Sequence, residues 1–330
     1  MDDEKNGTCP HVPFDREDGC KMRTTFRERQ PFADIFLECA RNAECRSLVR
    51  PERFMRVMRQ NKGSIAFLSG GGLDEEGLER KNPVIAALGD SVTAGHFEGI
   101  IASDPLKWFK KAAEIAGRNP DELDPEVIAD PEKAYHLIME LSSELPEGQT
   151  LPRVEITDTR ESYVEKFRQK LIDLYEETSV SAINAGIAGD NLIMMEKRLY
   201  RDVIRYQPDL VLINGSLNWN EDMGSTAFYK DLLIRTVKRV QDETDADIIL
   251  LTPNGIVDNE RNCLLLEERV DAIREAAGLR SVCLSDTYAV WEEARLAGCP
   301  WEELLANRNN HPGVLGHEVY ALTLMKLFVQ

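Results

Sequence analysis

The 330-residue chain is long enough for one large domain or for a core domain with additions, and its apolar content of 42% suffices for a sizeable core. Its formal net charge of −18 repels phosphate groups, which disfavours nucleic acid and membrane surfaces as partners. The chain starts with an acidic stretch and contains no run of about 20 apolar residues, so we expect a cytoplasmic protein without a signal peptide or a transmembrane helix.

Residues 1–80 predict a mainly helical extension that packs on the core. Helical patterns occupy 31–42 and 51–60, and the apolar run 64–68 is typical of a short buried strand. Four cysteines of this region could hold zinc together with His11, but their spacing fits no established zinc pattern: Cys9, Cys20, Cys39 and Cys45. Reduced thiols are the favoured interpretation, and no metal site is predicted.

From residue 81 onward, a regular alternation of strands and helices predicts a larger domain over 81–330. Apolar runs predict five strands, at 84–88, 180–184, 210–214, 247–251 and 281–285. Amphipathic patterns predict helices at 161–177, 191–206, 226–243, 264–278 and about 316–328. Strands separated by helices indicate an α/β fold, here a three-layer α/β/α sandwich with a five-stranded parallel sheet.

Residues 101–150 interrupt this alternation. They are acidic, contain five prolines and carry helical patterns at 105–117 and 131–144, so a helical insertion is predicted at about 101–150. An insertion after the first strand lies at the carboxyl edge of the sheet, where ligands bind in such folds. It either covers a substrate or only decorates the surface, and the sequence leaves both open.

The tripeptide Gly89-Asp90-Ser91 directly follows the first predicted strand. A tight turn at this place exposes the serine hydroxyl and frees its backbone N–H, which can stabilise the oxyanion formed when a carbonyl is attacked. Gly89 and Gly95 permit such a turn. The same loop could also merely connect two elements.

A serine nucleophile needs a base, and histidine is the commonest base near neutral pH. His311 lies in an asparagine-rich loop before the last helix, where its imidazole can reach the sheet edge. His317 falls inside that helix, which suits a buried structural role. His96 is close to Ser91 in sequence and is a candidate substrate contact.

Two further turns follow predicted strands, at 184–191 and at 214–220. Because the carboxyl ends of parallel strands meet at one edge of a sheet, both turns are expected to bring amide donors to the same place as Ser91.

The ordered motifs GDSVTAG, NAGIAGD, SLNW and NHPGVLGH make the chain similar to the SGNH/GDSL hydrolase superfamily of GDSL-like lipases and acylhydrolases, across about residues 83–328. The resemblance implies a flavodoxin-like sheet and a serine esterase. It implies Ser91 as the nucleophile and His311 as the catalytic histidine. It also implies an oxyanion hole made by the amides of Ser91 and Gly189 and the side chain of Asn218, and no cofactor.

The chain departs from the family pattern at two places. The third motif usually reads Gly-x-Asn-Asp, whereas here a tryptophan follows Asn218. The aspartate three residues before the catalytic histidine is replaced by Arg308, whose guanidinium cannot accept a hydrogen bond from an imidazole. The orienting group for His311 is then a backbone carbonyl near Arg308 or Asn309 or an acid from elsewhere such as Asp286, or it is absent and the site is a Ser-His dyad.

The sequence therefore predicts a serine ester hydrolase that acts through an acyl-enzyme on short-chain, acetyl esters, with O-acylated carbohydrate as the favoured substrate. Beside His96, Trp219 is a candidate substrate contact, because it could stack on a sugar ring or else lie in the core. An O-acyltransferase and a non-catalytic binding protein with the same fold are the alternatives. The oligomeric state is left open.

Overall fold

The computed structural model describes six segments of the chain: 32–60, 82–99, 105–152, 155–176, 178–307 and 309–329. The strand predicted at 64–68 and the side chain of Arg308 lie outside these segments. Across the described segments, no helix combines the length and the apolar character that crossing a bilayer requires.

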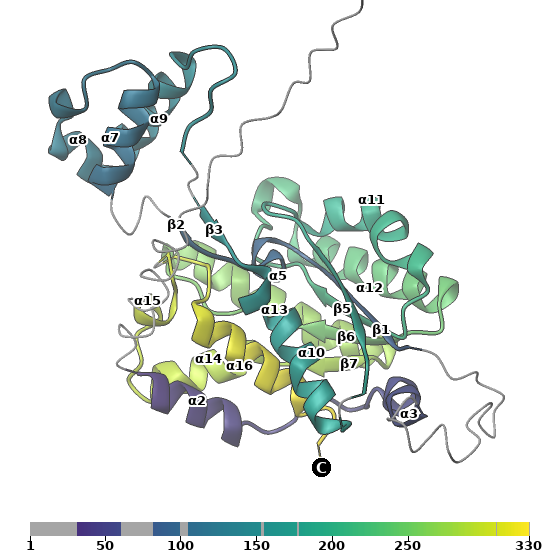
Figure 1. Cartoon of the computed structure of the whole chain (residues 1–330). Helices are drawn as coiled ribbons and strands as arrows, with labels where there is room; N and C mark the ends of the chain where they lie inside the picture. The colour runs from purple at the N-terminus through teal and green to yellow at the C-terminus, as the bar shows by residue number, and fades with distance from the viewer. Residues whose placement is uncertain are drawn as a thin grey trace, which may run out of the picture. The chain divides into compact units, whose positions relative to one another are not determined.

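A five-stranded parallel sheet forms the centre of the fold, in the order β4-β1-β5-β6-β7 (Figure 1). Its strands are β1 (Val84–Gly89), β4 (Ser181–Gly186), β5 (Leu210–Asn214), β6 (Asp247–Leu251) and β7 (Cys283–Ser285). This confirms the predicted α/β sandwich and all five of its strands. The bounds of β5 and β6 agree with the prediction, and those of the other strands differ by one or two residues.

Helices cover both faces of the sheet. One face packs against α11 (Leu192–Asp202), α12 (Thr226–Glu243) and α13 (Glu260–Arg280). The other face packs against α3 (Glu52–Gln60), α10 (Tyr163–Leu174) and α16 (Val314–Met325). The structure adds α14 (Thr287–Leu296) and the single turn α15 (Trp301–Leu304), which the sequence pattern did not predict.

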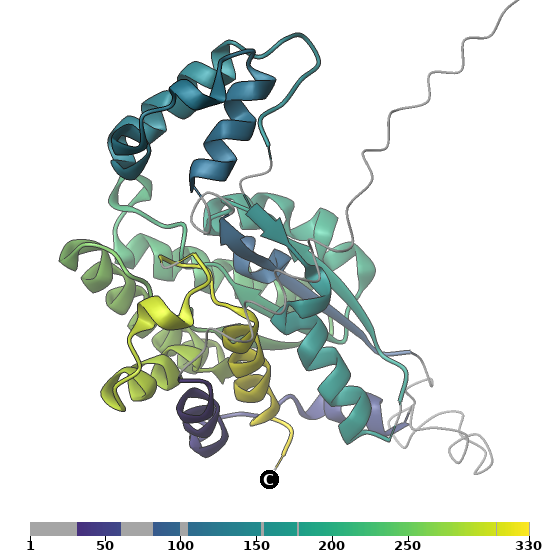
Figure 2. The same ribbon diagram turned by 60° about the vertical axis from the view of Figure 1, so that its left-hand side comes forward.

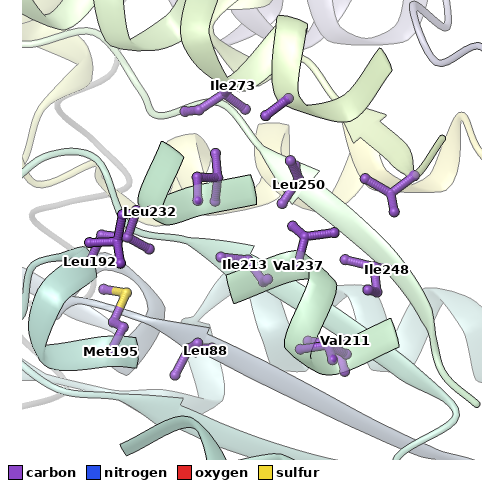
Figure 3. Close-up of a cluster of buried hydrophobic side chains, with 14 of the residues drawn as sticks. Leu88, Leu192, Met195, Val211, Ile213, Leu232, Val237, Ile248, Leu250 and Ile273 are labelled. Atoms are coloured by element: carbon purple, nitrogen blue, oxygen red, sulfur yellow. The ribbon is translucent and has the colours of Figure 1, made fainter. Parts of the chain in front are cut away.

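The side chains of the central strands alternate between two apolar clusters, because successive residues of a strand point to opposite faces. Figure 3 shows the cluster in which Leu88, Ile213 and Leu250 of three adjacent strands meet helical side chains such as Leu232 and Ile273. Their neighbours in sequence join the cluster on the opposite face: Ala87, Leu212, Ile249 and Leu251. The sheet is thus buried on both sides, which fixes its register and the position of its carboxyl edge.

The described part of the N-terminal extension consists of α2 (Ala33–Asn42) and α3. Helix α2 packs against α14 and α16. Its Phe36 is fully buried, and the Phe36 ring meets the ring of Trp291 edge-on, with 5.0 Å between the ring centroids. Helix α3 is tied to the sheet through the Phe54 N–H, which donates to the Asp247 carboxylate at 2.8 Å.

Two paired antiparallel strands flank the insertion in sequence: β2 (His96–Gly99) precedes it and β3 (Glu155–Thr157) follows it. The helices of the insertion lie side by side in both views (Figures 1 and 2): α7 (Pro105–Ile115), α8 (Pro125–Ala129) and α9 (Pro131–Ser143). Trp108, Phe109 and Leu141 form a small apolar core in which every buried member belongs to the insertion.

Candidate active site

Strand β1 lies at the switch point of the sheet, because β4 pairs with one of its sides and β5 with the other. Loops that leave such a point on opposite faces form the ligand crevice of open α/β sheets. Ser91 follows β1, Gly189 follows β4 and Asn218 follows β5. The topology therefore brings three of the predicted residues to one place.

Ser91 begins the one-turn helix α5 (Ser91–Ala94). The Asp90 side chain caps this helix by accepting from the Val92 N–H at 3.0 Å, and Gly95 ends it at a φ of 86°, a conformation that favours glycine. The backbone N–H of Ser91 lies in the first turn and so has no acceptor within the helix. The turn thus presents both the Ser91 hydroxyl and the Ser91 backbone N–H at the end of β1.

The side chains of Ser91 and His311 are in hydrogen-bond contact, with 3.0 Å between Oγ and Nε2. They lie 220 positions apart in sequence, and both residues are largely buried. A hydroxyl within this distance of an imidazole nitrogen is the geometry that a nucleophile and its general base require.

The loop that carries His311 is held by asparagine side chains. The Asn307 Oδ1 atom accepts from three consecutive backbone N–H groups, those of Asn309, Asn310 and His311, at 3.1, 3.0 and 2.9 Å. Asn254 donates to the Asn310 carbonyl at 2.9 Å. Neither Asn307 nor Asn254 was predicted, although an asparagine that precedes a turn is a typical local cap.

Asp286 is not the orienting acid suggested by the sequence. One of its oxygens accepts from the Thr252 hydroxyl at 3.0 Å, and its carboxylate pairs with Arg274 at 3.0 Å and with Arg46 at 3.4 Å. Asp286 follows β7, the outermost strand, three strands away from β1. At about 4.8 Å per strand this places it roughly 14 Å across the sheet from the end of β1.

The turn after β4 supplies the second predicted oxyanion donor. Gly189 has a φ of 78°, and an added Cβ would meet nothing within 4 Å. Among the hydrogen bonds between described residues, the Gly189 N–H has no acceptor. Asn218 approaches the same turn, because its Nδ2 atom donates to the Asp190 carbonyl at 3.1 Å and keeps a second hydrogen for another acceptor.

Two further histidines lie near His311. The His96 ring centroid is 6.1 Å from that of His311, and His96 is half-buried, which places it beside the proposed base. His317 is fully buried, and its Nδ1 accepts from the Tyr163 N–H at 3.0 Å. Burial lowers the pKa of His317 to about 3, so the ring stays neutral and structural near neutral pH.

Trp219 is a core side chain, which corrects its assignment as a candidate substrate contact. It is 5% exposed, and its indole N–H donates to the Gly224 carbonyl at 3.0 Å. Its ring packs edge-on against Tyr229, with 5.1 Å between centroids. A sugar ring cannot stack on a face that is already covered.

Asp90 is the acid nearest to the nucleophile along the chain. It is fully buried, and this burial raises the pKa of its carboxyl from 3.8 to about 7, while the Val92 N–H partly opposes the shift. Near neutral pH the carboxyl of Asp90 is therefore protonated in part of the molecules.

This raised pKa predicts that Asp90→Asn stabilises the protein at pH 8 but not at pH 4. Between pH 3.8 and 7 the unfolded chain releases the proton that the folded chain keeps, so the free energy of unfolding falls by up to about 1.4 kcal/mol per pH unit. Asparagine keeps the cap acceptor and cannot ionise. Urea unfolding of both proteins at the two pH values measures the effect, and an equal difference at both would contradict it.

Comparisons with known proteins identify the family to which the chain belongs. A family model described as "GDSL-like Lipase/Acylhydrolase family" matches residues 147–319, just over half of the chain. The match contains Gly189, Asn218 and His311 and begins beyond Ser91, within the last part of the predicted insertion. The insertion thus separates the first motif from the matched region.

An acetylxylan esterase from Geobacillus stearothermophilus is 27% identical over 164 residues, which cover 46% of this chain and 74% of that protein. A structure of a catalytic mutant of an acetylxylan esterase from the same organism matches 75% of this chain and 95% of its own, with a TM-score of 0.50 and 18% identity. A Parabacteroides merdae protein described as a GDSL-like lipase matches equal shares at a TM-score of 0.50 and 17% identity. At these identities the two structures support the fold alone. The family model, which covers more than half of the chain, and the acetylxylan esterase relative establish that the chain is an esterase of the GDSL-like lipase/acylhydrolase family, within the SGNH/GDSL hydrolase superfamily.

Proposed function

We propose that this esterase acts through an acyl-enzyme on Ser91 and hydrolyses acetyl esters of carbohydrates. The observation that carries the serine mechanism is the 3.0 Å contact between Ser91 Oγ and His311 Nε2 at the carboxyl edge of the sheet. This contact brings together the proposed nucleophile and the proposed base, which are far apart in the sequence.

In the proposed reaction, His311 Nε2 takes the proton of Ser91 while Oγ attacks the ester carbonyl. The amides of Ser91 and Gly189 and the Asn218 side chain hold the oxyanion of the tetrahedral intermediate. The protonated imidazole then gives its proton to the leaving alcohol. Water, deprotonated by His311, attacks the acyl-enzyme and releases the acid and the free serine.

The carbohydrate part of the proposal is supported by the named acetylxylan esterase relative and by His96. His96 is the first residue of β2, and its ring centroid lies 6.1 Å from that of His311. An imidazole can both donate to and accept from hydroxyl groups, which suits the alcohol side of a sugar ester.

Acetate release from acetylated xylo-oligosaccharides tests this specificity. The wild type should release acetate, and His96→Ala should lower kcat/KM about 10-fold for the oligosaccharide, because one buried hydrogen bond to a substrate hydroxyl is lost. The loss should be smaller for p-nitrophenyl acetate, which has no sugar hydroxyls. A wild type that cleaves p-nitrophenyl acetate but releases no acetate from the oligosaccharide would contradict the carbohydrate assignment.

A further inference from the structure

Arg198 of α11 is a buried cation that contacts two backbone carbonyls and one carboxylate, in β1, in β4 and in the turn after β4. Its Nε donates to the Asp190 carboxylate at 2.5 Å, its Nη2 to the Gly89 carbonyl at 2.8 Å and its Nη1 to the Ala185 carbonyl at 2.7 Å. The side chain is only 7% exposed, so water screens these bonds little. Asp202 provides a second carboxylate partner at 3.0 Å.

Each contacted segment leads directly to a donor of the proposed oxyanion hole. Gly89 ends β1, two residues before Ser91. Its carbonyl also accepts from the Ile187 N–H at 3.1 Å, so the turns after β1 and β4 meet at this one oxygen. The guanidinium therefore fixes the point at which these two turns touch.

The third donor, the Asn218 side chain, is connected to the guanidinium through Asp190, the residue that directly follows Gly189. The Asp190 carboxylate pairs with Arg198, while its carbonyl accepts from the Asn218 side chain at 3.1 Å. A single residue thus links the guanidinium to both the β4 turn and the side-chain donor after β5.

We infer that Arg198 is a positioning residue that fixes the spacing of the three oxyanion donors. The inference rests on the proposed function. Such donors stabilise a transition state only if they are held about 2.7–3.1 Å from the developing charge. A planar guanidinium presents five donors from three nitrogens in a rigid fork, whereas the ammonium of lysine presents its three donors from a single atom and cannot reach acceptors spaced as widely. A loosened turn therefore lowers kcat more than it weakens substrate binding.

Two variants test this role at temperatures well below their unfolding transitions. Arg198→Lys keeps the charge but loses the fork. Asp190→Ala removes the carboxylate that links the guanidinium to the β4 turn and to Asn218, while Asp202 still pairs with the guanidinium. For folded protein, we expect kcat for p-nitrophenyl acetate to fall about 10- to 100-fold, with KM within about 3-fold. The rate of serine labelling by a fluorophosphonate should fall in parallel, because the phosphonyl oxygen occupies the same hole.

Arg201→Ala is the matched control, since Arg201 lies on the same helix, is 61% exposed and pairs with the same Asp202. It should keep the wild-type kcat. If both test variants lose thermal stability but keep kcat and the labelling rate within about 2-fold, Arg198 has a purely structural role and the inference is overturned. A wild type without esterase activity would instead overturn the proposed function itself.

Discussion

Replacing the proposed nucleophile, Ser91→Ala, is expected to lower kcat/KM for p-nitrophenyl acetate by about 10³-fold or more. The variant removes the hydroxyl that faces His311 Nε2 at 3.0 Å, so an acyl-enzyme cannot form. The fold should persist, because α5 is capped by Asp90 and the change removes a single oxygen atom. Initial rates and a far-UV circular dichroism spectrum of both proteins measure the two effects.

Ser225→Ala provides the control for this change. The Ser225 hydroxyl caps α12 by accepting from the Phe228 N–H at 3.3 Å, and it has no part in the proposed reaction. Its loss should cost about 1 kcal/mol of stability and leave kcat unchanged. Equal turnover by Ser91→Ala and the wild type would contradict the serine mechanism.

The second large effect is expected for His311→Ala, with kcat/KM reduced about 10³-fold. The loss should be greater for an alkyl acetate than for p-nitrophenyl acetate, because an alkoxide needs a proton to leave and p-nitrophenolate does not. Combining this change with Ser91→Ala should add almost nothing, since the two groups act as a unit.

His136→Ala serves as the matched histidine control, because His136 is exposed on α9 of the insertion. Its activity should equal that of the wild type on both esters. A His311→Ala enzyme with wild-type rates on the alkyl ester would show that another group is the base.

The sheet could be predicted because its strands are short and mostly apolar, and the central strands β1, β5 and β6 are buried on both faces. Element ends were less predictable, since they depend on caps and backbone conformation. Strand β7 begins two residues later than predicted, because Ser281 takes a left-handed φ of 51° and ends α13. Helix α13 begins four residues earlier, because the Asn259 side chain caps it by accepting from the Asn262 N–H. Helix α14 was not predicted. Because it packs against both α2 and α16, its apolar residues do not form a single stripe that the sequence pattern would reveal.

The site was predictable only as far as local motifs reach. Ser91, Gly189 and Asn218 each follow a strand at the carboxyl edge, so sheet topology alone brings them together. Asp286 also follows a strand, but the strand order places β7 at the far edge, which the sequence does not reveal. Arg198 lies within an otherwise apolar helical face that includes Leu192, Met195 and Leu199, and a charge at such a position is a signal of a buried ion pair.

The most direct test of the central claim is the intact mass of the protein after reaction with a fluorophosphonate. The wild type should gain one phosphonyl group, peptide mapping should place it on Ser91, and Ser91→Ala should gain none. A wild type that stays unmodified, or a modification that persists in Ser91→Ala, would show that the hydroxyl facing His311 is not an activated nucleophile.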